Sequence, residues 1–344
     1  MNKITKPIMK LVSKVVNSVT QEITAGGDSA PFDPADNLKL MCRKMGAEGI
    51  VMLKNINGVL PLTKDDTVSV FGRVQNDTFY VGYGSGGDVK VPYKVSIMDG
   101  LRNNHFININ EELAAVYEKW CKENPVDDGF WGHWPMCYEE MSVSRELAVR
   151  AASKSDTAIV VIGRAAGEDR ENKLEEGSYY LTENEKLMLT EVTAAFKKVV
   201  VLLNCGSVID MAELYAYGDK ISSILYIWQN GMETGNCVAD ILTGIETPSG
   251  KLTDTIAVDY ADYPSSDNFG GRLSNDYTED IYVGYRYFET FAKSKVIYPF
   301  GFGLSYTNFE IKDSNLVVES DCVTVTAKVK NTGKFKGKEV VQVY

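Results

Sequence analysis

A cluster of charged side chains directly follows one of the most apolar segments of the sequence. Residues 158–163 (AIVVIG) form a β-branched run without alternation, which predicts a strand buried on both faces. The charged residues after it are Glu168, Asp169, Glu171, Glu175 and Glu176, with Arg164 and Arg170 among them. Sites in open α/β sheets lie at the carboxyl ends of strands, so a carboxyl group on this loop is well placed for proton transfer. Neighbouring carboxylates would raise its pKa and the arginines would lower it, and the sequence leaves the sign of the net shift open.

A glycine-rich segment at 82–87 (GYGSGG) fits the pattern G-x-G-x-x-G of dinucleotide-binding loops. Its context disfavours a phosphate site: the segment does not directly follow a predicted strand, and Pro92 interrupts the path to the next helix. No lysine follows it as in a Walker motif. The segment is therefore a plain surface turn or a loop that borders a ligand site. Nucleotide binding is a distant third among the functions that the sequence allows, and a mononucleotide-induced shift in melting temperature would reveal it.

Aromatic residues gather in two places. Phe130, Trp131 and Trp134 could stack on a sugar ring or pin a loop to the core, and packing is the more common use of aromatic side chains. Trp131 and Trp134 are kept as candidate substrate-binding residues. The second group consists of Tyr282, Tyr285, Tyr287 and Phe288, which we interpret as a structural wedge between two domains.

The elements that must position these residues form an α/β pattern. Two more apolar runs, at 199–204 and 221–228, predict buried strands, and a capping box at 182–185 begins a helix between the first two strands, which makes a βαβ unit. A further amphipathic segment, 238–244, ends in a glycine suited to a helix C-cap. Shorter strands are predicted at 68–72 and 106–109, around a helical turn near 97–101. Residues 37–258 are therefore predicted to form an open, mostly parallel sheet sandwiched by helices.

The rest of the chain has other patterns. Residues 259–304 are rich in Tyr, Gly and Asp without periodicity and are predicted to form an ordered connector. Alternation from Val323 to Val329 predicts the beginning of an antiparallel β-sandwich over 305–344. Such a domain needs about seven strands, so this incomplete one indicates a fragment of a longer polypeptide. The lead segment, 1–36, contains an amphipathic helix over 1–24, which we expect to dock on its own protein in preference to a membrane surface.

Composition narrows the function classes. The 344 residues carry a formal net charge of −11, which argues against nucleic acid as a partner. With only 2 histidines, a histidine-based metal site or a Ser-His-Asp triad has little to build on. The 6 cysteines are far apart and are expected to be reduced thiols of a cytoplasmic protein. Neither a secretory signal nor an apolar stretch long enough to cross a membrane is visible in the sequence.

Several segments, in order along the chain, resemble the family 3 glycoside hydrolases, which include many β-glucosidases and β-xylosidases. Residues 47–55 (AEGIVMLKN) and 58–62 (GVLPL) resemble the start of their α/β-sandwich domain. Residues 162–172 (IGRAAGEDREN) and 176–181 (EGSYYL) resemble their acid/base loop. The later matches are 228–231 (WQNG), 248–252 (PSGKL), 277–288 (YTEDIYVGYRYF) and 298–307 (YPFGFGLSYT), the last two at the passage into a fibronectin type III-like domain.

The resemblance implies a retaining, exo-acting β-glycosidase that uses two carboxyl groups and no cofactor. Glu168 matches the catalytic acid/base, with Glu171 and Glu176 as the other candidates. The glycine-rich loop would border the sugar site, with Asp88 as a binding residue. The nucleophilic Asp of the family lies on a TIM-like barrel, which usually comes first. Here the resemblance implies a permuted order, with the barrel beyond Tyr344 as the partner of this half.

Two functions of different classes therefore stand. The chain is part of a β-glucosidase-like enzyme acting on oligosaccharides or glycosides, inactive by itself because the nucleophile is elsewhere. Alternatively, it is a non-catalytic carbohydrate-binding or assembly module. The presence or absence of a barrel after Tyr344 separates them, and the sequence does not identify the sugar.

Overall fold

The computed structural model describes residues 35–84, 89, 91–127, 129, 134–168, 171–271 and 273–343. The amphipathic helix predicted over 1–24 lies outside these residues, as do Asp88, Phe130 and Trp131.

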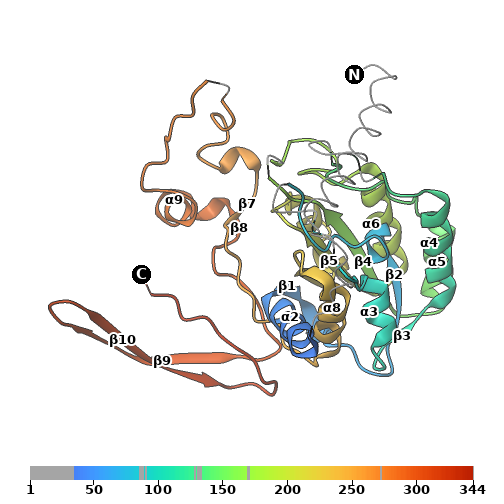
Figure 1. Cartoon of the computed structure of the whole chain (residues 1–344), viewed down its shortest axis with the longest axis horizontal. Coiled ribbons are helices and arrows are strands. Elements are labelled where there is room, and N and C mark those ends of the chain that lie inside the picture. Colours follow the sequence, from blue (N-terminus) through green and yellow to red (C-terminus); the bar gives the residue numbers. More distant parts are fainter. Residues whose placement is uncertain are drawn as a thin grey trace, which may run out of the picture.

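A six-stranded sheet forms the centre of the fold, in the order β1-β6-β5-β4-β2-β3 (Figure 1). The strands are β1 (Val51–Asn55), β2 (Thr67–Phe71), β3 (Asn108–Ile109), β4 (Thr157–Arg164), β5 (Lys198–Cys205) and β6 (Ser223–Tyr226). All neighbours pair in parallel except β1 and β6, which are antiparallel. This confirms the predicted α/β class with a mostly parallel sheet, and it adds β1, which the sequence analysis did not identify as a strand.

Both faces of the sheet are buried, as the uninterrupted apolar runs predicted. On β5, Val199, Val201 and Leu203 belong to one hydrophobic cluster, and Val200 and Leu202 belong to the other. The first cluster is completed by α4 (Glu111–Glu123), α5 (Arg145–Ala152) and α6 (Glu183–Ala195). The second includes residues of α2 (Asp36–Gly49), α3 (Ile97–Asn103) and α8 (Thr234–Thr243). Helices therefore cover the sheet on both sides.

Two predicted helix signals are confirmed in detail. The hydroxyl of Thr182 accepts a hydrogen bond from the backbone N–H of Glu185 at 3.3 Å, and the Glu185 carboxylate accepts one from the Thr182 N–H at 2.8 Å. This reciprocal capping box begins α6. Helix α8 is followed by Gly244 with φ 73°, a left-handed conformation that favours glycine.

The strand predicted at 221–228 was too long. Residues 218–220 form a short 3-10 helix (Gly218–Lys220), so β6 begins only at Ser223. Its other end is set by Trp228, whose φ of 52° is incompatible with an extended strand. The strand predicted at 106–109 is likewise reduced to β3 at Asn108–Ile109.

The segment predicted as a connector contains regular structure. The short strands β7 (Ile256–Ala257) and β8 (Val296–Tyr298) pair antiparallel, and α9 (Tyr285–Phe291) precedes β8. Phe288 of α9 is buried and packs edge-on against Tyr263 at a ring separation of 5.5 Å. A helix of only seven residues between glycine-rich and tyrosine-rich stretches leaves no helical periodicity to detect.

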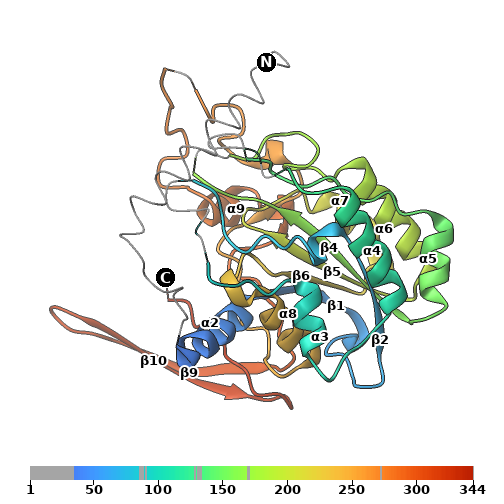
Figure 2. The same ribbon diagram turned by 45° about the vertical axis from the view of Figure 1, so that its right-hand side comes forward.

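The last elements form a two-stranded antiparallel hairpin of β9 (Phe309–Val318) and β10 (Val323–Asn331). The hairpin projects away from the helix-covered sheet, and β10 is exposed along its whole length (Figure 2). This confirms the predicted change to antiparallel structure at the carboxyl-terminal side.

Two further properties concern the described residues only. No helix among them is both long and apolar enough to cross a membrane, and no group of three His, Cys, Asp or Glu side chains could hold a metal ion. All six cysteines of the chain lie in this part and are free thiols.

Candidate active-site loop

The loop that carries Glu168 begins where β4 ends, at Arg164. The Arg164 side chain is fully buried and pairs with both carboxylate oxygens of Glu185 at 2.7 Å. It also donates hydrogen bonds to the carbonyl oxygens of Ser178 at 3.0 Å and Tyr180 at 3.1 Å. Burial alone would lower the pKa of Arg164, but the Glu185 carboxylate raises it above its ordinary value. Arg164 therefore anchors the start of the loop in the core.

Backbone hydrogen bonds hold the loop beyond Arg164. The Ala165 N–H donates to the Met136 carbonyl at 2.7 Å. The Tyr83 N–H donates to the Ala166 carbonyl at 2.7 Å, and the Glu168 N–H donates to the Tyr83 carbonyl at 3.1 Å. Tyr83 and Gly167 thus form an isolated parallel bridge. Glu168 follows this bridge directly and is exposed, so backbone hydrogen bonds hold the chain at the residue that carries the candidate carboxyl group.

The glycine-rich segment lies against this loop. A Cβ atom at Gly82 would come within 2.8 Å of the Ala166 carbonyl oxygen, and one at Gly84 would lie 2.5 Å from the Cβ of Glu168. Gly84 also has a φ of 113°, which side chains other than glycine rarely adopt. These described glycines therefore allow the close approach of two backbone segments at Glu168. The predicted role as a loop bordering a site fits this placement, whereas residues 85–88 lie outside the described part.

Trp134 packs behind the loop. Its ring is buried and stacks on that of Tyr83, with centroids 5.4 Å apart and planes 5° from parallel. The hydroxyls of Tyr83 and Tyr138 lie 3.2 Å apart, and Tyr138 stacks on Phe79 at 4.5 Å. Trp134 thus packs against a neighbouring ring, which is the use that the sequence analysis favoured for these aromatic residues. A role of Trp134 in substrate binding stays a prediction.

A cavity of about 400 Å³ adjoins these aromatic residues. Polar and aromatic side chains line it, including Asp77, Tyr80, Tyr83, Lys94 and Trp134. Tyr83 connects this cavity to the loop, because its carbonyl accepts the hydrogen bond from Glu168. Sequence reasoning missed Tyr80 and Tyr138, although aromatic residues near a glycine-rich loop are a signal that could have been followed.

Three of the acidic residues that follow Glu168 along the loop line a different cavity. Glu171, Glu175 and Glu176 line a cavity of about 300 Å³ together with Lys173 and Cys137. The Glu176 carboxylate lies 3.5 Å from the ammonium group of Lys186. Among the described residues, Glu168 lies against Gly84, whereas Glu171, Glu175 and Glu176 line this other cavity.

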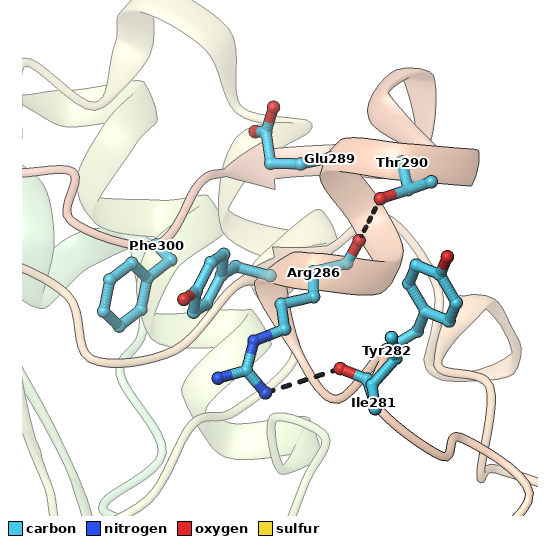
Figure 3. A pocket seen from close by; sticks show the side chains of 7 residues that line it. Ile281, Tyr282, Arg286, Glu289, Thr290 and Phe300 are labelled. Atoms are coloured by element: carbon cyan, nitrogen blue, oxygen red, sulfur yellow. Dashed lines mark hydrogen bonds between the residues drawn. The ribbon is translucent and has the colours of Figure 1, made fainter. Parts of the chain in front are cut away.

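A further hollow, of about 810 Å³, lies beside α9 and shares no lining residue with the Glu168 loop (Figure 3). Tyr285 stacks on Phe300 with ring centroids 4.6 Å apart, and Arg286 lies over the Tyr285 ring. The Arg286 guanidinium also donates to the Ile281 carbonyl at 3.4 Å. This aromatic hollow offers one carboxylate, Glu289, and is not joined to the candidate loop.

Comparisons with known proteins agree on one family. A model of the C-terminal domain of glycosyl hydrolase family 3 matches residues 50–306, from β1 to just before β9. A β-glucosidase of Ruminococcus albus is 49% identical over 302 residues, which cover 88% of this chain and 31% of the relative. β-Glucosidase A of Butyrivibrio fibrisolvens is 38% identical over 349 aligned residues, covering 90% of this chain and 41% of the relative.

Solved structures agree with these sequence relatives. A β-glucosidase from Paenibacillus barengoltzii superposes with a TM-score of 0.85 at 48% identity, covering 89% of this chain and 34% of that one. β-Glucosidase 3B from Thermotoga neapolitana, solved with α-D-glucose, gives a TM-score of 0.78 at 37% identity, covering 87% and 42%. The chain therefore spans less than half the length of these four relatives.

Proposed function

This chain belongs to glycosyl hydrolase family 3, and from that premise we propose that it is the acid/base-supplying part of a retaining, exo-acting β-glycosidase. The substrate is a terminal sugar of an oligosaccharide or glycoside, with a β-glucoside as the first expectation because the named relatives are β-glucosidases. The observation that carries the proposal is the exposed Glu168, held at the carboxyl end of β4 against the glycine-rich segment.

Glu168 is proposed as the acid/base because it is exposed and its backbone is held by a hydrogen bond. A group that donates a proton to the departing oxygen and later removes one from water must be reachable from outside yet fixed in position. Glu168 is exposed, and its N–H is held by the Tyr83 carbonyl. Glu171 and Glu176 stay alternatives of lower rank, since they line a separate hollow. Trp134 and the undescribed Asp88 and Trp131 are proposed to border the sugar.

A retaining mechanism needs a second carboxylate about 5 Å from the acid/base. We propose that an Asp on a barrel domain outside these 344 residues supplies it. The domain limits proposed with it are 37–258 for the α/β sandwich, 259–304 for the connector and 305–344 for a fibronectin type III-like start. By itself the chain is proposed to be inactive, and its six free thiols favour the cytoplasm.

The test is made on the polypeptide encoded by the whole native gene. It should hydrolyse p-nitrophenyl β-D-glucoside, and proton NMR of the first product should show the β-anomer, as a retaining mechanism requires. Comparing its hydrolysis of the corresponding xyloside, arabinoside and N-acetylglucosaminide identifies the sugar that the enzyme prefers. The second candidate, a non-catalytic carbohydrate-binding module, predicts saturable oligosaccharide binding without hydrolysis of any of these substrates.

Azide tests the role of Glu168 separately. In Glu168→Ala the glycosyl-enzyme would form from an activated aryl glycoside but would be hydrolysed slowly, because no base deprotonates water. Azide needs no base, so it should restore turnover and give a β-glycosyl azide. If azide instead restored turnover to Glu171→Ala or Glu176→Ala and not to Glu168→Ala, the acid/base would be that residue.

A further inference from the structure

The Glu168 loop is contacted by a side chain that comes from the end of a different strand. Gln229 follows β6 and donates a hydrogen bond from its amide nitrogen to the Arg164 carbonyl at 3.3 Å. The N–H of Gly206, after β5, donates to the same carbonyl at 3.3 Å. The residue at which the loop leaves β4 is therefore tied to the ends of both β5 and β6.

Space around the Gln229 amide is tightly limited. A Cβ atom at Gly206 would lie 2.5 Å from the Cβ of Ala166 and 2.9 Å from the Gln229 amide oxygen. A Cβ atom at Gly82 would lie 2.8 Å from the Ala166 carbonyl oxygen and 3.7 Å from the same amide oxygen. The amide oxygen of Gln229 thus lies beside Gly206 and near Gly82, and a side chain at either glycine would crowd Ala166, two residues before Glu168.

The backbone before Gln229 is strained in a way that directs this side chain. Trp228 has a φ of 52°, an unfavourable conformation for a bulky residue. Its carbonyl accepts a hydrogen bond from the buried Asn204 amide at 2.5 Å, and its indole N–H donates to the Gly49 carbonyl at 3.2 Å. Strain that the surroundings hold in place is typical of residues whose geometry matters for function. Here the strained turn places Gln229 beside the loop.

We propose that Gln229 is a positioning residue for the acid/base: its amide, bonded to the Arg164 carbonyl and beside Gly206, fixes residues 164–166 and thereby the place of the Glu168 carboxyl group. Gln229 does not touch the reacting atoms. Its effect is therefore largest in steps that need a proton delivered from Glu168, and small in steps that do not. This inference rests on the proposed role of Glu168.

The experiment compares leaving groups in the full-length enzyme. Gln229→Met keeps the length of the side chain but removes the amide donor, and Gly206→Ala crowds Ala166. Since a displacement of about 1 Å can cost about 100-fold in rate, each variant should lower kcat/KM on methyl β-glucoside by about tenfold or more. On 2,4-dinitrophenyl β-glucoside, whose leaving group needs no proton, kcat/KM should change by less than about threefold.

One matched variant acts as a control. Asn108→Ala removes an amide that likewise donates to backbone carbonyls, of Lys64 and Asp66, at the amino-terminal end of β3. It should leave the two kcat/KM values unchanged. Thermal unfolding of each variant identifies loss of folding, and if Gly206→Ala fails to fold, Gln229→Met decides the question.

Glu168→Gln in the same series separates this inference from the proposed function. Suppose that Glu168→Gln loses kcat/KM mainly on the poor leaving group. If the folded Gln229→Met variant then loses kcat/KM equally on both substrates, or on neither, the positioning role of Gln229 is wrong. If the loss of kcat/KM in Glu168→Gln is the same on both substrates, the assignment of the acid/base is wrong, and the proposed role of Gln229 is then wrong too.

Discussion

Replacing Glu185 by alanine should be among the most destabilising single changes in the α/β part of this chain. The variant leaves the Arg164 guanidinium fully buried, with carbonyl acceptors but no countercharge. Breaking a buried ion pair in this way costs about 3–5 kcal/mol. Loss of the carboxylate that accepts from the Thr182 N–H at the start of α6 adds about 0.5–1 kcal/mol. Against typical domain stabilities of about 5–15 kcal/mol, this is a large share of the margin.

The assay is equilibrium urea unfolding followed by tryptophan fluorescence. Glu183→Ala is the matched control, because Glu183 lies in the same first turn, and its ion pair with Lys186 is an exposed contact of 3.3 Å. That change should cost less than about 1 kcal/mol. Replacing the buried pair by Arg164→Met and Glu185→Leu together should recover much of the loss. The reasoning is refuted if Glu185→Ala is no more destabilising than Glu183→Ala.

Two other predictions concern buried ionisable groups. Burial raises the pKa of Glu140 to about 8 from an ordinary 4.5, so the folded state keeps a proton that the unfolded state releases; the contribution of this group to stability should be complete below about pH 4.5 and be lost as the pH rises to about 8. Urea unfolding between pH 5 and 8 should show this slope for the natural protein and a flatter one for Glu140→Gln, and equal slopes would contradict the assignment. Burial also raises the pKa of Cys205 and Cys237 to about 12, whereas Cys322 is exposed between β9 and β10. Iodoacetamide at pH 8 should therefore modify Cys322 in the folded protein and the other two only in urea, as peptide mass spectrometry would show; early modification of Cys205 would count against its burial.

The fold was predictable where a local pattern matches the tertiary environment. Strands β4 and β5 are long, apolar and β-branched because both of their faces are covered, so their runs are visible in the sequence. Strand β1 was missed because its five residues, VMLKN, form a short antiparallel edge whose last two positions are only partly buried. The early end of β6 follows from the left-handed conformation of Trp228, which no local residue type announces.

The residues of the candidate site also differ in how far the sequence could predict them. Glu168 could be found because it follows a clear strand within a stretch that resembles a family motif. Gln229 also lies in a family-like match, 228–231, but its contact with Arg164 could not be predicted, because it spans 65 positions of sequence through the parallel order of β4, β5 and β6. The glycine-rich segment is visible in the sequence, but the contacts of Gly82 with Ala166 and of Gly84 with Glu168 are seen only in the folded chain.

The measurement that tests the central claim most directly is the leaving-group dependence of Glu168→Gln in the full-length enzyme. If Glu168 donates the proton to the departing oxygen, kcat/KM on alkyl and unactivated aryl β-glucosides should fall by about 100-fold or more. On 2,4-dinitrophenyl β-glucoside it should stay close to that of the natural enzyme, so that a plot against leaving-group pKa becomes much steeper. An equal loss on all substrates, or no loss on the poor ones, would contradict the assignment of Glu168 as the acid/base.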